Sequence, residues 1–577
     1  MKRLHRAAQA LALLFGGLAA ACSVMTPAAA PDDTAGSVRT LDQGGDWTRS
    51  DRVGFYSRDQ GSRIMPLAWM RSLRAPDGTP FLADGLRRFG YIANGDVPSS
   101  PLPVGFVVGN QEGEDAIGMT CAACHTRQIV ANGQAWRVDG GPALADFQRL
   151  LTELDAAVGE VLASDAAFKA FALSVLGPAA GDADADAAAL RTRVADWYRP
   201  YHLLVSRALP TPAWGVGRLD AISMIFDRLN GLDLGSPPDF TIARNIYPAN
   251  APVRYPFLWN AARQDRTQWP GFADNGDALL GQARNLGEVI GVFAVFHPMK
   301  DEHRIFGINY IKDDSADFAG LKDLESTIAR IGPPKWPWPV DAALAARGGA
   351  VFAANCASGC HEVARGAQRL SLVETWKTPV MNVGTDTREW SILDRRVDPG
   401  VLTGIGVGGL RAPLAASELP SNVLGTAVIG AILDHAVHVD VFGLPTTVED
   451  PLAFTLPAKL QGTFGHPPDA ASPPPGSYES RVLQGIWAAA PYLHDGSVPT
   501  LAELLKAPAD RVAVFAVGPN YDTAGVGLAA QQPPGATTMR TTGCEALDSG
   551  NSRCGHAFGW DLPPADKAAL VEYMKTL

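Results

Sequence analysis

Two short segments that combine cysteine and histidine constrain this chain of 577 residues more than any other feature of its sequence. Residues 121–125 read Cys-Ala-Ala-Cys-His, and residues 356–361 read Cys-Ala-Ser-Gly-Cys-His. A Cys-x-x-Cys-His run is the attachment signature of c-type haem, because two thiolates form thioethers to the porphyrin and the following histidine ligates the iron. One helical turn also places both sulfurs at the same porphyrin edge. The two segments therefore predict two covalent c-type haems, one in each half of the chain.

The same residue types suit other chemistry, so alternatives stand beside haem. A Cys-x-x-Cys pair also binds zinc or forms a redox disulfide. The second segment has three residues between its cysteines instead of two, which leaves attachment through one sulfur, or a plain disulfide, as alternatives there. The predicted haem-binding residues are Cys121, Cys124, His125, Cys356, Cys360 and His361, with His125 and His361 as proximal iron ligands.

The N-terminal segment is typical of an export signal. Its first six residues carry three basic side chains, and residues 7–21 are apolar but too short for a comfortable membrane span. Small residues precede Cys22, as in a bacterial lipoprotein box, which predicts lipidation of Cys22 and contact with a membrane only through that anchor. Ordinary cleavage after Ala21 is the alternative. We expect a bacterial protein of the periplasm or cell envelope, or a secreted one.

Two cysteines remain after these assignments. Cys544 and Cys554 lie close together in a chain that we expect to be exported, which predicts a disulfide closing a surface loop. His556 follows closely, but its spacing from these cysteines does not fit a third haem motif.

Length and composition indicate more than one domain. A chain of this length is too long for a single core. Its net charge of −11 argues against nucleic acid as a partner and favours a basic redox protein. A small-molecule oxidant is the alternative partner. The proline-rich run 333–339 is the strongest boundary signal. The predicted segments are a signal peptide 1–21, a tether 22–50, an N-terminal haem domain 51–332 and a C-terminal cytochrome c domain 333–577.

Hydrophobic periodicity predicts several helices. Leu144, Phe147, Leu151, Leu154 and Val158 recur at helical spacing after Pro142, and we expect them to form one buried face. Residues 341–356 predict a short helix before the second haem motif, and residues 562–577 predict a C-terminal helix. The predicted fold is mainly α-helical, with two cytochrome c-like haem domains and long loops.

The segment 481–501, which contains Pro491-Tyr492-Leu493-His494-Asp495-Gly496, resembles the dihaem cytochrome c peroxidase superfamily, and more closely its rubber-oxygenase-like branch. The resemblance extends to residues 118–125, 138–142, 336–339 and 555–559, so it spans most of the mature chain. It implies a catalytic N-terminal haem with a distal face open to O₂ or peroxide. It also implies a C-terminal electron-transfer haem with two histidine ligands, His361 and His494.

Three residues are candidates for the distal side of the first haem. Glu288 is a candidate acid/base, because O–O cleavage needs a proton shuttle. Phe293 and Phe296 are alternative candidates for an apolar distal wall. Electron transfer between the haems has three candidate tryptophans, namely Trp269, Trp336 and Trp338.

The sequence leads to one main function and two alternatives. The main prediction is a dihaem oxidoreductase that acts with peroxide or O₂ at the first haem, with an apolar organic molecule as a candidate substrate. One alternative is a non-catalytic electron carrier in which both irons have two protein ligands. The other is a maturation enzyme that oxidises a partner protein through its haems.

Overall fold

The computed structural model describes residues 38–97, 101–177, 184–368, 374–407, 411–439 and 474–577. The predicted signal peptide, Cys22 and residues 22–37 of the predicted tether lie outside the described residues. Residues 38–50 are described, and they are packed against the body of the protein, since Leu41 and Trp47 are buried.

The first haem motif lies between two β-hairpins. One belongs to a three-stranded sheet in the order β2 (Met65–Pro66), β4 (Glu114–Met119), β3 (Phe106–Gln111). The other belongs to a sheet in the order β1 (Arg39–Thr40), β6 (Gln134–Asp139), β5 (Thr126–Ala131). The β5–β6 hairpin turns at Asn132 and Gly133, both with positive φ, which is the geometry that an Asn-Gly pair favours in a two-residue hairpin. The short helix α4 (Cys121–Cys124) connects β4 to β5.

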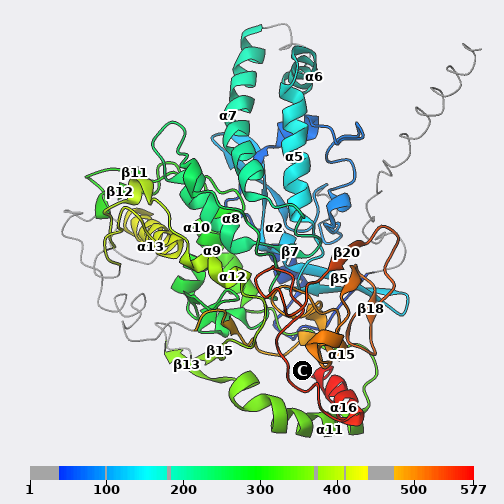
Figure 1. Cartoon of the computed structure of the whole chain (residues 1–577). Coiled ribbons are helices and arrows are strands. Elements are labelled where there is room, and N and C mark those ends of the chain that lie inside the picture. Colours follow the sequence, from blue (N-terminus) through cyan, green and yellow to red (C-terminus); the bar gives the residue numbers. More distant parts are fainter. Residues whose placement is uncertain (1–37, 98–100, 178–183, 369–373, 408–410, 440–473) are drawn as a thin grey trace, which may run out of the picture.

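Three helices form an arm that projects at the top of Figure 1: α5 (Phe147–Leu162), α6 (Asp165–Leu176) and α7 (Asp184–Ala208). The Asp146 side chain caps α5 by accepting from the Arg149 amide. The helix therefore begins at Phe147 and not at the predicted Pro142. Four of the five residues predicted for its buried face are buried: Phe147, Leu151, Leu154 and Val158.

A second group of helices packs beside the first haem motif. It comprises α8 (Ala221–Arg228), α9 (Ala278–Gly291), α10 (Phe318–Ile328) and α13 (Pro420–Val439). Asp277 caps α9 by accepting from two amides, and ten of its fourteen residues are buried. α13 comes from the second half of the chain and contributes to the same core as α9. Helices from both halves thus enclose the region behind the first haem motif.

The second haem motif lies beside a helix pair. α11 (Ala342–Phe352) runs into a π-helical segment, Ala353–His361, and packs against the C-terminal helix α16 (Pro564–Met574). Arg347 and Asp566 form an ion pair of 2.7 Å, and the rings of Phe352 and Tyr573 are 5.4 Å apart. Both helices were predicted from the sequence.

Short elements complete the chain. The remaining helices are α2 (Arg49–Ser57), α3 (Leu67–Ser72), α12 (Arg388–Ser391) and α15 (Leu501–Leu504). The remaining strands form ribbons of two: β7 (Arg218–Leu219) with β8 (Val253–Arg254), β9 (Arg266–Thr267) with β10 (Ala273–Asp274), β11 (Met299–Lys300) with β12 (Ile308–Asn309), β13 (Ala364–Gln368) with β14 (Glu374–Lys377), β15 (Val380–Met381) with β16 (Tyr478–Glu479), β17 (Val514–Val517) with β20 (Thr537–Arg540), and β18 (Tyr521–Asp522) with β19 (Gly527–Leu528).

The prediction of a mainly α-helical protein is wrong. The structure is mixed, with 39 % helix and 17 % strand. The reason lies around the first haem motif, where hairpins flank a helix of only four residues. Hairpin signals such as Asn132-Gly133 outweigh the helical expectation that a cytochrome motif brings.

One aromatic core draws on both halves of the chain. Trp259 donates its indole N–H to the Gln484 carbonyl at 2.7 Å, and Trp487 donates to the Pro334 carbonyl at 2.9 Å. Trp336 and Trp338, from the proline-rich run, pack their rings against Trp487. The proline-rich run is therefore held within this core.

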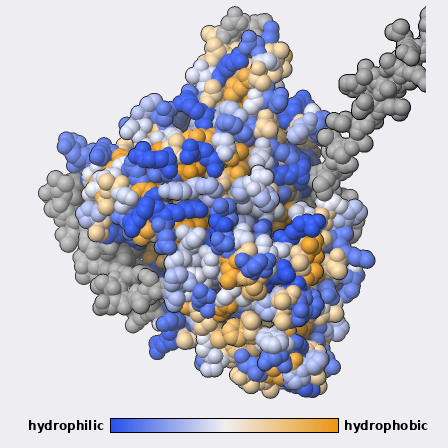
Figure 2. All heavy atoms as spheres, in the orientation of Figure 1, coloured by the Kyte–Doolittle hydropathy of each residue, from blue (hydrophilic) through white to orange (hydrophobic). Residues whose placement is uncertain are grey.

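The face seen in Figure 2 intersperses polar and apolar side chains. Within the described ranges, no helix combines the length and the apolar character that crossing a bilayer requires.

Candidate haem-binding sites

The first motif is held in place by its own turn. The Thr120 hydroxyl accepts from the Ala122 amide and caps α4, and the His125 amide donates to the Cys121 carbonyl at 3.0 Å. Cys121 and Cys124 therefore occupy the start and the end of one helical turn, with His125 directly after it. This arrangement is the one that thioether attachment requires.

A backbone carbonyl orients the His125 ring. Its Nδ1 lies 2.8 Å from the carbonyl oxygen of Pro256, which only accepts, so Nδ1 carries the proton and donates. The lone pair is then on Nε2, the atom that binds a metal. Burial lowers the pKa of His125 to about 4, so the ring is neutral at pH 7. The Nε2 lone pair of His125 is thus available to bind iron.

The cavity in front of this motif, here the first haem cavity, has apolar and charged walls. Cys121, Cys124 and His125 line it together with Glu288 and Arg284, which lie one turn apart on α9. Among the described residues that line it, His125 is the only histidine, and the thioethers of Met119 and Met224 also reach it. The rest of the described lining of this cavity is therefore supplied by groups other than imidazole.

Of the predicted distal residues, the structure brings only Glu288 to this cavity. Burial raises the pKa of Glu288, against the opposing charge of Arg284. Phe293 follows the end of α9 and packs against Tyr201 and Arg228, at 5.6 and 5.0 Å. Phe296 packs against Tyr310 in the core shared with α13. Neither phenylalanine is among the residues that line the first haem cavity.

The extra residue of the second motif is accommodated by a break in the helix. Ser358 is extended and Gly359 has a φ of 75°, a left-handed conformation that glycine adopts at little cost. Cys356 and Cys360 still line one cavity with His361, here the second haem cavity. Like Cys121 and Cys124, neither cysteine is in a disulfide within the described residues, whereas Cys544 and Cys554 form a disulfide as the sequence predicts.

Two further histidines line the second haem cavity, and they differ in position. The ring centroids of His361 and His556 are 6.0 Å apart, with the two ring planes tilted by 49°. An iron held between two imidazoles would place the centroids roughly 6 Å apart, because each metal–nitrogen bond is about 2 Å. His494, the predicted second ligand, lines the same cavity, and its ring stacks on Tyr478 at 3.8 Å. Burial lowers the pKa of His556 to about 4 and that of His494 to about 3.

His556 was not predicted from the sequence as a ligand. It has a φ of 47° in a loop and comes next to His361 only through the packing of distant segments. The signal that could have pointed to it is the resemblance of residues 555–559, which include His556, to the rubber-oxygenase-like branch. The His361 ring itself is oriented by the Ser480 hydroxyl, 3.0 Å from Nδ1.

One tryptophan lies between the two cavities. Trp269 lines both of them, as does Arg481. The guanidinium groups of Arg254 and Arg481 lie over the Trp269 ring at 4.7 and 4.6 Å. Trp336 and Trp338 are absent from the described lining of either cavity.

The buried arginines also test whether haem fits. Within the described part of the chain, Nη1 of Arg254 and Nε of Arg481 have no hydrogen-bond partner. Arg481 has a counter-charge in Glu479, whose carboxylate oxygen lies 3.9 Å from Nε, and a haem would add two propionates as acceptors for the unpaired donors. Each site thus combines paired cysteines, an oriented imidazole and guanidinium N–H donors without hydrogen-bond partners. This combination fits a c-type haem.

Comparison with known proteins identifies one segment of the chain. Residues 477–516 match a family described as RoxA-like, cytochrome c-like. The matched stretch includes Tyr478, Ser480, Arg481 and His494, all of which line the second haem cavity. A cytochrome c-like domain is thus found in the second half. The expectation of two such domains is corrected, since the single match lies beside the second motif and the first motif lies between hairpins.

Two proteins of Sinorhizobium fredii are similar to this chain. The uncharacterized protein y4iJ is 29 % identical over 92 % of this chain and 92 % of its own length. The uncharacterized protein y4iM is 24 % identical over 65 % of this chain and 74 % of its own length. The similarity therefore covers both haem motifs and nearly the whole chain in the first case.

Proposed function

We propose that this protein is a dihaem c-type cytochrome and an oxidoreductase, with a reactive first site and an electron-transferring second site. The difference between the two cavities carries the proposal. The second haem cavity is lined by His361 and His556, whose ring centroids are 6.0 Å apart. The first presents one histidine among its described lining residues, which also include Glu288. An iron with two protein ligands transfers electrons, whereas one with an exchangeable position binds small molecules.

The residues around the first site suit the activation of peroxide or O₂, which is the chemistry that a bound haem with an open coordination position supplies. Glu288, which lines the cavity, would serve as the acid/base that holds and returns a proton there. Its raised pKa brings it closer to the working pH of a proton shuttle. Arg284 holds Glu288 in place electrostatically and is itself anchored by Glu325.

Trp269 links the two sites in this proposal. It touches both cavities and is fixed by its indole N–H, which donates to the Arg254 carbonyl at 3.2 Å. The flanking guanidinium groups of Arg254 and Arg481 disfavour a positive charge on this ring by repulsion. They therefore favour brief passage of an electron over lasting oxidation of the indole.

A non-catalytic electron carrier is the second candidate, because the Met119 and Met224 thioethers line the first haem cavity. Methionine is an axial ligand in cytochromes c. Low-temperature electron paramagnetic resonance on the haem-loaded protein decides between the two. A high-spin ferric signal that cyanide shifts, in the oxidised or half-reduced state, supports the oxidoreductase. Two low-spin centres that ignore cyanide in both states, with one of them altered by Met224→Leu, establish the carrier.

Export to the periplasm or cell envelope, with lipidation at Cys22, is part of the same proposal. The support is the N-terminal sequence and the disulfide between Cys544 and Cys554, a bond that persists in oxidising compartments. The acidic net charge of −11 supports a basic redox partner. Metabolic labelling with a fatty acid, compared between the natural chain and Cys22→Ala, tests the lipid anchor.

A further inference from the structure

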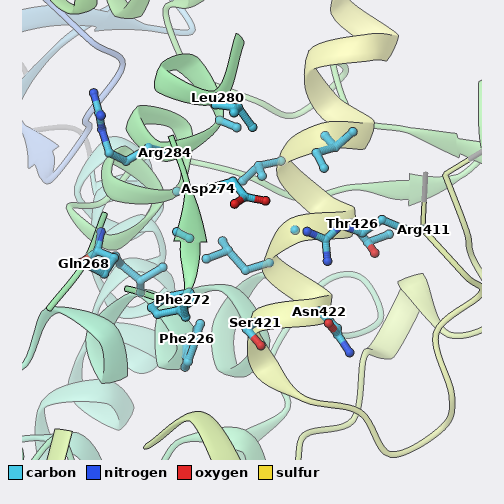
Figure 3. A pocket seen from close by; sticks show the side chains of 18 of the residues that line it. Phe226, Gln268, Phe272, Asp274, Leu280, Arg284, Arg411, Ser421, Asn422 and Thr426 are labelled. Carbon is cyan, nitrogen blue, oxygen red and sulfur yellow. The ribbon is translucent and has the colours of Figure 1, made fainter. Parts of the chain in front are cut away.

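A large cavity adjoins the first haem cavity. It has a volume of about 630 Å³, which is within the range of sites that bind small organic molecules. α8, α9 and β10 form one wall, and α13 forms the other (Figure 3). Its lining includes the exposed residues Ala412 and Pro413, so the cavity reaches the surface. We name it the side cavity.

The side cavity and the first haem cavity share a wall. Ile225, Gln268, Arg284 and Glu288 line both. Figure 3 shows Gln268 and Arg284 on one side of the side cavity, and Arg411, Thr426, Asn422 and Ser421 on the opposite side, along α13. A molecule bound in the side cavity would therefore contact, at one end, the residues that face the first haem.

Most of the side cavity is apolar. Branched and aromatic side chains cover the middle of both walls: Ile222, Phe226, Phe272, Leu280, Val428 and Ile429. Such a lining favours a hydrocarbon or aromatic body, because burying apolar surface is the main source of affinity in sites of this kind. A peroxide or O₂ molecule alone would leave nearly all of this space unused.

The end formed by α13 has polar groups that lack partners. Thr426 is fully buried, and within the described residues its hydroxyl has no hydrogen-bond partner. Nε of Arg411 likewise has none there. Burial lowers the pKa of Arg411, while the charge of Asp274 across the cavity opposes that shift. Burying a hydroxyl and a guanidinium nitrogen without hydrogen-bond partners costs free energy, unless a ligand supplies those partners.

The Arg411 guanidinium lies against α13 at a glycine. A Cβ atom built at Gly425 would come within 2.4 Å of Arg411 Cζ. The planar Arg411 guanidinium, with its fork of N–H donors, therefore lies flat against α13 next to Thr426. Any larger residue at position 425 would displace it. A planar carboxylate is the group that such a fork binds with two parallel hydrogen bonds.

We propose that the side cavity binds an amphipathic organic carboxylate, with its carboxylate at Arg411 and Thr426 and its apolar body directed towards Glu288. As a statement about the substrate of the first haem site, this rests on the proposed function. As a statement about a binding site, it stands on the cavity alone.

Isothermal titration of the haem-loaded protein with decanoate and with decan-1-ol tests the proposal. We expect decanoate to bind with one-to-one stoichiometry and more tightly than decan-1-ol. Arg411→Gln should weaken decanoate binding about tenfold or more and leave decan-1-ol within about twofold, since it removes a charged hydrogen bond. Ala283→Phe, which fills the side cavity from α9, should weaken both ligands. Arg244→Gln is the matched control, because Arg244 is 72 % exposed and lies elsewhere.

Two further variants keep the test decisive if Arg411→Gln does not fold. Arg411→Lys keeps the charge but loses the fork, and Gly425→Ala displaces the guanidinium; each should weaken decanoate selectively. Equal binding of acid and alcohol, or no binding of decanoate, overturns the proposal. Absence of decanoate binding beside a cyanide-sensitive iron rejects this inference alone. Decanoate binding beside two inert irons rejects the proposed function alone.

Discussion

The two haem regions use nearly the same attachment motif in different surroundings. The first motif is a single capped turn between hairpins, and the wall it faces carries a carboxylic acid and an arginine. The second is a broken helix end beside a helix pair, and it faces a histidine. The comparison teaches that similar Cys/His motifs can lie in cavities with different linings, and in the proposed function residues remote in sequence would decide what each iron does.

The sharpest test of the comparison is to remove the second imidazole. His556→Ala should convert the second iron almost completely from low-spin to high-spin, because the opposite ligand is lost, and added imidazole should restore the original spectrum. Electron paramagnetic resonance measures the change. The control is His494→Gln, which should leave the second iron low-spin. The reverse pattern, in which His494 is essential and His556 is dispensable, would support the ligand pair predicted from the sequence, His361 and His494.

The second test removes the acid that distinguishes the first region. Glu288→Gln should lower peroxide turnover by about 10²–10⁴-fold, which is the usual contribution of a positioned acid/base. The cyanide-shifted resonance should persist, since the iron environment is kept. Glu302→Gln on an exposed loop is the control. Full activity in Glu288→Gln would remove Glu288 from the mechanism.

The pH dependence of turnover sharpens the same point. Burial raises the pKa of Glu288 above the usual 4.5, and the group must be ionised to accept a proton. Turnover should therefore fall as the pH drops through this raised pKa, and it should reach its full rate at pH values above it. A pH profile of kcat/KM measures this decrease, which forms the acidic limb of the profile. Glu288→Gln should abolish it, so a profile unchanged by the substitution would assign the limb to another group.

A smaller effect is expected from the residue between the regions. Trp269→Phe should slow electron transfer from the second haem to the first, because it shortens the aromatic bridge, while both irons keep their ligands. Stopped-flow reduction followed at the two haem bands measures the rate. Trp338→Phe is the control, since Trp338 lies in the aromatic core and lines neither described cavity. Equal slowing in both variants would indicate a packing effect only.

The smallest effect concerns the partners of the proximal histidines. His125 is oriented by a carbonyl and His361 by the Ser480 hydroxyl. Ser480→Ala should shift the potential of the second haem by roughly 30–60 mV, since a tenfold change in a one-electron equilibrium is about 59 mV. Spectroelectrochemical titration measures it. A shift in the first haem instead would contradict the assignment of Ser480.

The sequence predicted what is local and missed what depends on tertiary packing. The apolar spacing of Phe147 and Leu151 predicted α5, and residues 562–577 predicted α16, because one helix face repeats every few residues. The hairpins around the first motif were missed, although Asn132-Gly133 is a strong turn signal.

The candidate sites divide along the same line. Glu288 lines the first haem cavity because α9 presents it one turn after Arg284, whereas Phe293 lies beyond the helix end and turns away. His556 belongs to the second site only because a C-terminal loop packs next to His361. The side cavity was also beyond prediction, since it forms where α9 meets a helix from the other half of the chain.

The aromatic core that joins Trp259, Trp336 and Trp487 has a consequence for maturation. Because this core draws on both halves, the N-terminal half cannot complete its interior until the C-terminal half has been synthesised. A group that binds only the folded state stabilises that whole state, so attachment of either haem should raise the melting temperature of the entire molecule. Haem insertion would thus act as a checkpoint on assembly, with the first attachment easing the second.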